Sequence, residues 1–190
     1  IMGYIGVGQD GITIGKHTLW IPAGAMTPST TAGCAALATT ETTAGSPDMT
    51  TLDFDTTTEE HAQFSVCFPK SWNLGAITFQ PVWTKSGAVT AGLDGVAWGL
   101  QGVCMADDAS IDQVYGTEVT VGLDAAKTVE DVFMSAESAD VTITGAADDT
   151  ICFLQISRVV ASTSPLDDMD VDARLLGVRV FYITDAETDV

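Results

Sequence analysis

Hydrophobic and polar residues alternate along much of the chain, which is the pattern of a β-strand with one buried face. The alternation is clearest in the segment AQFSVCF at 62–68, where every second residue from Ala62 onward is apolar. The segment LDFD at 52–55 repeats the pattern. A longer apolar run, ICFLQISRVV at 151–160, is expected to form a central strand.

Further strands are expected where short runs of β-branched and aromatic residues lie between turn-forming residues. These runs lie at 12–14, 18–21, 77–83, 95–105, 119–121, 130–136, 141–144 and 174–184. The whole pattern predicts about nine or ten strands at intervals of roughly ten residues. Such regular spacing is typical of a sandwich of two antiparallel sheets.

One segment favours a helix. Residues 106–116 (ADDASIDQVYG) begin with Asp107 and Asp108, either of which can cap a helix, and end at Gly116. The sequence therefore predicts an all-β, single-domain antiparallel β-sandwich of jelly-roll type with one short helix.

The ends of the domain are expected to differ from its centre. Residues 1–26 are expected to form an N-terminal strand or arm, and residues 27–190 a single β-sandwich domain. Within that domain, 27–50 is rich in Thr, Ala, Gly, Ser and Pro, which favours an extended loop or arm. A neighbouring subunit is expected to hold this segment.

The composition is that of a folded but strongly acidic protein. Hydrophobic residues make up 46% of the chain and charged residues 17%, so the chain can bury a core. Seven basic and 26 acidic residues give a net charge of −19. Such a charge repels nucleic acid and anionic membranes, so we expect neither as a partner. No apolar run approaches the roughly 18 residues of a membrane-spanning helix.

Candidate catalytic residues are few. His17 and His61 are the only histidines, and no G-x-S-x-G motif presents a nucleophilic serine. The four cysteines are far apart in the sequence, so they predict no zinc site and are expected to be reduced, buried thiols. We therefore expect no catalytic residues and a protein that is not an enzyme.

An acidic cluster follows the 151–160 run. Asp168, Asp170 and Asp172 match the first three acidic positions of a calcium-binding loop. An EF-hand is excluded because Ala173 stands where that loop requires glycine and Arg179 where it requires glutamate. A non-standard calcium site and a solvated acidic loop are the two remaining interpretations, and no other cofactor is expected.

Four segments carry a resemblance to a known family. They are IPAGAMTPSTTAGCA at 21–35, LDFDTTTEEHAQFSVCFPKSW at 52–72, GVAWGLQGVCMADDASIDQVYG at 95–116 and DARLLGVRVFYITDAETD at 172–189. Together they resemble small virion structural proteins of tailed bacteriophages, many from marine or alphaproteobacterial hosts. The resemblance implies a non-enzymatic building block of the virion with a β-sandwich core, and it carries over no catalytic residue.

The leading hypothesis is a capsid decoration or cement protein. It would assemble as a homotrimer and bind other virion proteins, such as the major capsid protein, through non-covalent contacts. Apolar anchors near the N-terminus are candidates for that interface. They are Trp20, Ile21, Pro22 and Met26, for which ordinary core packing is the alternative.

The sequence is also compatible with other functions. A tail-fibre or head-spike module that binds host glycans would need an exposed cleft with aromatic and carboxylate side chains. A main capsid subunit is a second alternative, because one sandwich can build a shell. A polysaccharide hydrolase would need a pair of carboxylates across a cleft, and no pair stands out.

Overall fold

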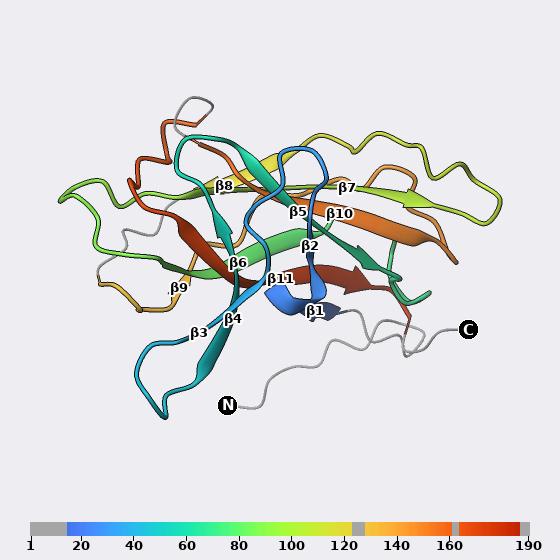
Figure 1. Ribbon diagram of the computed structural model, residues 1–190. Coiled ribbons are helices and arrows are strands. Elements are labelled where there is room, and N and C mark those ends of the chain that lie inside the picture. Colours follow the sequence, from blue (N-terminus) through green and yellow to red (C-terminus); the bar gives the residue numbers. More distant parts are fainter. Residues whose placement is uncertain (1–14, 123–127, 161–163, 187–190) are drawn as a thin grey trace, which may run out of the picture.

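A computed structural model describes residues 15–122, 128–160 and 164–186. These residues form two antiparallel β-sheets packed face to face, which confirms the predicted sandwich (Figure 1). Among them, no helix has the length and apolar character needed to cross a membrane.

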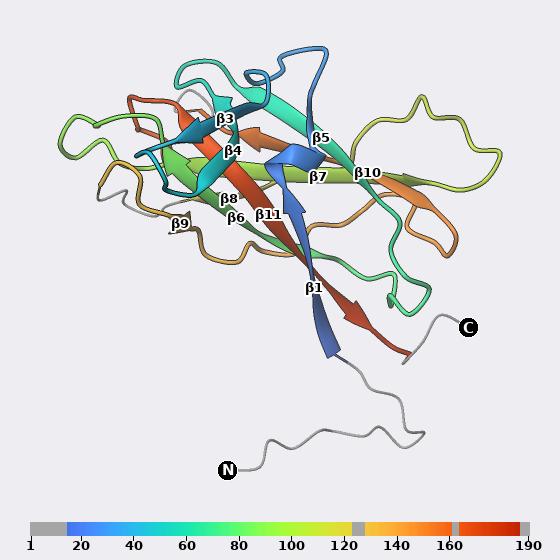
Figure 2. The same ribbon diagram turned by 60° about the horizontal axis from the view of Figure 1, so that its bottom comes forward.

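The first sheet, called here the β11 sheet, has the order β3-β4-β11-β6-β9, with β1 also paired to β11. Figure 2 shows β1 and β11 crossing the front of the molecule. The strands of the β11 sheet are β1 (Gly15–Pro22), β3 (Ala38–Glu41), β4 (Asp48–Phe54), β6 (Thr78–Lys85), β9 (Phe133–Met134) and β11 (Ala173–Thr184).

The second sheet, called here the β10 sheet, has the order β2-β5-β10-β7-β8. The apolar run at 151–160 supplies its central strand, as expected. Its strands are β2 (Thr27–Pro28), β5 (Glu60–Val66), β7 (Ala97–Met105), β8 (Val119–Gly122) and β10 (Ile151–Arg158).

The long strand β11 organises the first sheet. One edge pairs with β6 along most of its length. The other edge pairs first with β4, from Ala173 to Leu175, and then with β1, from Gly177 to Thr184. The pairing with β6 has a register shift between Leu175 and Gly177, at the same point where the opposite edge changes its neighbour from β4 to β1.

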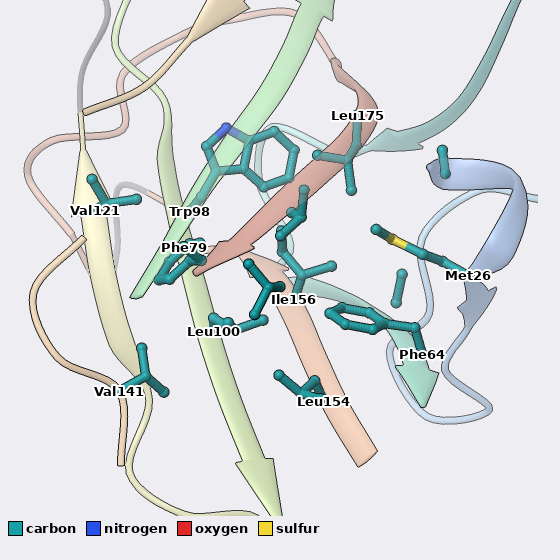
Figure 3. Close-up of a cluster of buried hydrophobic side chains, with 14 of the residues drawn as sticks. Met26, Phe64, Phe79, Trp98, Leu100, Val121, Val141, Leu154, Ile156 and Leu175 are labelled. Atoms are coloured by element: carbon teal, nitrogen blue, oxygen red, sulfur yellow. The ribbon is translucent and has the colours of Figure 1, made fainter. Parts of the chain in front are cut away.

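The core lies between the sheets, where the inward residues of each strand meet. Figure 3 shows Leu100 and Ile156 of the β10 sheet in one cluster with Phe79 of the β11 sheet. Trp98 also lies there, edge-on to Phe54 with the ring centroids 5.1 Å apart. Alternating positions in the sequence thus fill the interior, as the period of two predicts.

A buried ion pair lies within this apolar interior. Arg158 and Asp167 are 0% and 1% exposed, and two hydrogen bonds of 2.9 Å join the guanidinium to the carboxylate. The other guanidinium N–H groups donate to the backbone oxygens of Phe54, Met169 and Val171. All five donors are therefore used, which offsets the cost of removing the charge from water.

The one short helix is not at 106–116, so that prediction is wrong. Within the described residues the one helix is a 3₁₀ helix, η1, at Ala23–Ala25. In 106–116 Asp108 has a left-handed φ of 60°, and Ile111 and Val114 are 73% and 85% exposed. A helix here would have had no neighbouring element against which to bury its apolar side chains, and helices depend on such packing.

The expectation of reduced, buried cysteines is also wrong for most of them. Cys104 and Cys152 are register partners in β7 and β10 and form a disulfide. Cys67 is exposed, and only Cys34 is a buried free thiol. Sequence spacing could not reveal this pair, because 48 residues separate two cysteines that strand pairing makes neighbours.

The Thr-rich segment at 27–50 is not a free arm of the described chain. It contains β2, β3 and the start of β4, and these strands pair within this chain, β2 with β5 and β3 with β4. Of the expected N-terminal strand or arm, residues 15–22 form β1 in the β11 sheet. Residues 1–14, including the strand expected at 12–14, lie outside the described residues.

Candidate functional site

Aromatic and basic side chains lie on the outer face of the β11 sheet. Register partners in antiparallel strands share a face, and Trp20 is paired with Arg179, and Thr18 with Phe181. On β6 and β9 the same face continues through Val82 to Met134, which is 45% exposed. We call this surface the β1–β11 strip, made up of Trp20, Pro22, Val82, Met134, Arg179 and Phe181.

Trp20 is the most prominent side chain of the strip, and 48% of it is exposed. Its indole lies against Gly177, where an added Cβ would come within 2.5 Å of the ring and 2.6 Å of the Ile21 carbonyl oxygen. Glycine at this position therefore lets the ring rest on the β11 backbone. The indole therefore packs against the β11 backbone on one side, and the rest of the ring is exposed to solvent.

Two cations flank the aromatic rings. Lys16 forms an ion pair with Glu137 and lies 4.8 Å from the centre of the Phe181 ring. Arg179 donates a hydrogen bond of 3.0 Å to the Gln80 side chain. In the described ranges no carboxylate lies within ion-pair distance of Arg179, so its charge is available to a partner.

The structure separates the four predicted interface residues. Trp20 and Pro22 are exposed on the strip and remain candidates. Ile21 is half-buried and packs against the core, and Met26 is 5% exposed within it. For Met26 the core-packing alternative is therefore the correct one.

The three aspartates of the predicted calcium site are not brought together. Asp168 accepts a hydrogen bond of 2.7 Å from the Gly95 N–H, and Asp170 accepts bonds from Thr90. Asp172 lies apart, and burial, together with nearby acidic groups, raises the pKa of its carboxyl. In the described part of the chain no group of three or more His, Cys, Asp or Glu residues is placed to hold a metal. The geometry therefore fits loop anchoring better than calcium binding.

A second candidate surface lies on the outer face of the β10 sheet. The Gln101 amide donates to Gln155, 2.7 Å away, and Gln155 in turn donates to Ser29, 3.1 Å away. Beside this chain of hydrogen bonds lie two hollows with volumes of about 320 and 230 Å³, which share Thr27 and Gln63. Polar side chains thus form a continuous surface across four strands.

Glu118, Ser157 and His61 lie farther along the same face. The Ser157 hydroxyl donates to the Glu118 carboxylate at 2.6 Å. Burial raises the pKa of that carboxyl, and Glu59 adds to the effect, while the Ser157 bond and His61 oppose it. The His61 Nδ1 atom is buried and has no hydrogen-bond partner among the described residues. In a catalytic triad the serine donates to a histidine that is oriented by a carboxylate, whereas Ser157 donates directly to Glu118, so this trio lacks the order of a triad.

An acidic hollow of about 550 Å³ lies where β7 ends and β10 begins. Its lining includes Asp107, Asp108 and Asp149, together with the exposed Cys67. Asp149 is 3.2 Å from Lys70, with which it forms an ion pair. Nothing in this hollow resembles a paired acid and base across a cleft.

No protein-family model matches the chain, and no curated protein matches it. Among solved structures, a carbohydrate-binding module specific for non-crystalline cellulose, CBM28, shares 15% identity over 90% of this chain and 87% of its own, with a TM-score of 0.40. The family 11 module from Clostridium thermocellum shares 8% identity over 92% and 90%, with a TM-score of 0.37.

A larger protein is also similar over part of its length. A cycloisomaltooligosaccharide glucanotransferase from Paenibacillus sp. shares 10% identity with a TM-score of 0.39. The match covers 84% of this chain but only 18% of the glucanotransferase. Likeness this distant bears on neither the ligand nor the activity of this chain.

Several features of these surfaces were missed at the sequence level. The β10 face depends on cross-strand partners such as Gln63 and Gln155, which are far apart in the chain. Their signal is a polar residue at every second position of two strands, but that pattern alone describes any solvated face. Glycine within an apolar strand, as at Gly99, Gly102 and Gly177, is a local signal of a close contact.

Proposed function

We propose that this chain is a non-enzymatic structural protein of a tailed-phage virion, a capsid decoration or cement protein that works as a homotrimer. The resemblance of its four sequence segments to virion structural proteins supports the proposal that the chain is part of a virion. The β1–β11 strip is the observation that carries the assembly role. Interface centres are enriched in aromatic residues and arginine, and the strip presents both in Trp20, Phe181 and Arg179.

Charge complementarity favours a second copy of this chain as the occupant of the strip. The chain has a net charge of −19, so most of a neighbour's surface is acidic. Arg179 has no carboxylate partner among the described residues and can pair with one on the neighbour. A contact between two different surfaces of identical subunits forms a ring where the rotation closes, and the homotrimer proposed here is a ring of that kind.

Location in the virion is tested by immunogold electron microscopy on the phage that encodes the chain. Antibody against the purified chain should label the head surface. Labelling at the tail tips would instead favour the fibre alternative, and unlabelled virions would overturn the proposal.

Assembly is tested by light scattering after size exclusion. The wild-type chain should run at three times its subunit mass of 19.8 kDa. Trp20→Ala and Arg179→Gln should each shift the population toward monomer by at least about tenfold in dissociation constant, since aromatic and arginine anchors dominate interfaces. Val114→Ala removes an apolar side chain that lies outside the strip and is even more exposed than Trp20, and it should leave the trimer intact. A wild-type monomer, or trimers unaffected by both strip variants, would contradict the assignment of the strip.

A further inference from the structure

We infer that the outer face of the β10 sheet is a binding site for a neutral oligosaccharide. The site, called here the β10 groove, is independent of where in a virion the chain resides. It consists of Thr27, Ser29, Gln63, Ser65, Phe153 and Gln155. The assembly role proposed for the β1–β11 strip, on the opposite face, does not involve these residues.

Strand register places the groove residues on one face. Thr27 of β2 is the partner of Gln63 in β5, which in turn is the partner of Gln155 in β10. Gln155 is also the partner of Gln101 in β7, so four strands contribute to one row. The next row, Ser65 with Phe153, lies on the same face because side chains two residues apart do so.

The groove is hollowed as well as polar. One hollow of about 320 Å³ is lined by Thr27, Ser29, Gln63 and Gln155, among others. The adjoining hollow of about 230 Å³ adds Ser65 and Phe153. Together they fall within the usual range of small-ligand clefts, about 300–1,000 Å³.

Part of the groove is already held in place. Gln155 is only 8% exposed, and both ends of its amide are engaged, by Gln101 and by Ser29. The Gln63 amide, by contrast, makes no side-chain hydrogen bond to the described residues and is half-buried beside the hollows. The Gln155 amide is thus held in a fixed position at the base of the groove, and the Gln63 amide is free to form hydrogen bonds with a ligand.

The chemistry of the lining selects the ligand class. Hydroxyl and amide groups donate and accept hydrogen bonds, as sugar hydroxyls do, and Phe153 offers an aromatic surface for the apolar face of a sugar ring. None of the residues that line the two hollows is charged. With a net charge of −19 the protein repels anions, and the groove holds no carboxylate to attract cations. A neutral saccharide satisfies all of these conditions.

The test uses isothermal titration calorimetry with oligosaccharides of three to six units. Neutral gluco-, galacto- and manno-oligosaccharides form one set of probes, and uronic-acid oligosaccharides form the charged set. At least one neutral probe should bind saturably, and the charged probes should bind at least about tenfold more weakly. Gln63→Leu should weaken the neutral probe about five- to tenfold by removing the free amide. Phe153→Ala should weaken it by about tenfold through loss of the aromatic surface.

Matched controls separate binding from folding and from assembly. Gln113→Ala removes an exposed amide far along the chain, outside the groove lining, and should leave affinity unchanged. Trp20→Ala should also leave it unchanged, so a failed trimer and a failed groove are told apart. The inference is overturned if no neutral probe binds, if the charged probes bind equally well, or if folded Gln63→Leu and Phe153→Ala proteins both keep full affinity.

Discussion

The outer faces of the two sheets are built from the same kind of antiparallel ladder but carry different side chains. The β11 face presents Trp20, Phe181 and Arg179, with Lys16 at its edge. The β10 face presents amides and hydroxyls, with Phe153 as its aromatic residue. Because the two faces point away from each other on opposite sides of one core, both can be occupied at once.

The difference shows how an acidic chain can bind selectively. Depletion of charge marks the centre of a protein interface, and on a chain with 26 acidic residues a face poor in carboxylates is uncommon. On the β11 face the available charge is positive, which suits an acidic macromolecular neighbour. On the β10 groove the lining is neutral, which suits an uncharged ligand. Under the two proposals, the same fold would carry an assembly surface and a ligand surface on opposite sides of its core.

The largest expected effect tests whether both faces depend on one core. Asp167→Asn removes the charge that compensates Arg158 in the interior, and an unpaired buried charge costs about 3–5 kcal/mol. Urea unfolding should show a loss of that size. Trimer formation and saccharide binding should be lost together as the protein unfolds.

The control for this variant lies in the same loop. Asp168 is exposed and accepts a hydrogen bond from Gly95, a role that asparagine can keep. Asp168→Asn should therefore change the free energy of unfolding by less than about 1 kcal/mol. Equal effects of the two substitutions would show that the buried pair does not hold the sandwich together.

A smaller effect is expected from a substitution at Gly177, which should disturb the β11 face and leave the β10 face intact. Alanine there would press on the Trp20 ring and on the Ile21 carbonyl oxygen, an overpacking that costs about 1–3 kcal/mol. Gly177→Ala should weaken the trimer and leave saccharide affinity unchanged in calorimetry. Gly24→Ala, whose new methyl group would meet Thr50 at an ordinary 3.8 Å, should do neither. Loss of saccharide affinity in Gly177→Ala would show that the faces are coupled through the core.

The sequence predicted the sandwich because period-two alternation is a local property of each strand. The strand expected at 130–136 shrank to Phe133–Met134, and the one at 141–144 became bridges at Val141 and Thr144. Composition cannot show how much of an apolar run finds a pairing partner. The helix at 106–116 failed for a related reason, since capping residues predict a helix only where a surface exists to pack against.

The candidate sites were less predictable than the fold. Trp20 and Pro22 were proposed as apolar anchors near the N-terminal arm, but Arg179, the register partner of Trp20, is 159 residues away and is brought there only by the β1–β11 register. The aspartate cluster was misleading because spacing along a loop does not fix where carboxylates point. Asp170 accepts a hydrogen bond from Thr90, and neighbouring Asp167 is paired with Arg158.

The smallest effect is expected from titration of Glu118 on the β10 face. Burial raises its pKa, and Glu59 adds to this, while the Ser157 hydrogen bond and His61 oppose it. A carboxyl whose pKa is raised by folding binds its proton more tightly in the folded state, so stability falls as pH rises from the ordinary value through the raised one. Glu118→Gln avoids this cost and can still accept the Ser157 bond. The variant should melt at a higher temperature than wild type at pH 7, and the gap should close toward pH 4.

Glu137 on the β11 face provides the opposite case. Hydrogen bonds from Lys16 and Thr78 lower the pKa of its carboxyl, so its ionised form stabilises the fold above the ordinary pKa, and that contribution is lost as pH falls through the lowered one. Glu137→Gln should therefore melt below wild type at pH 7, and its gap should also shrink on acidification. Thermal melts of both variants at pH 4 and pH 7 compare the two faces directly. Shifts of the same sign at pH 7 would mean that burial does not control the Glu118 carboxyl, because the Ser157 bond would then stabilise its charge as Lys16 stabilises that of Glu137.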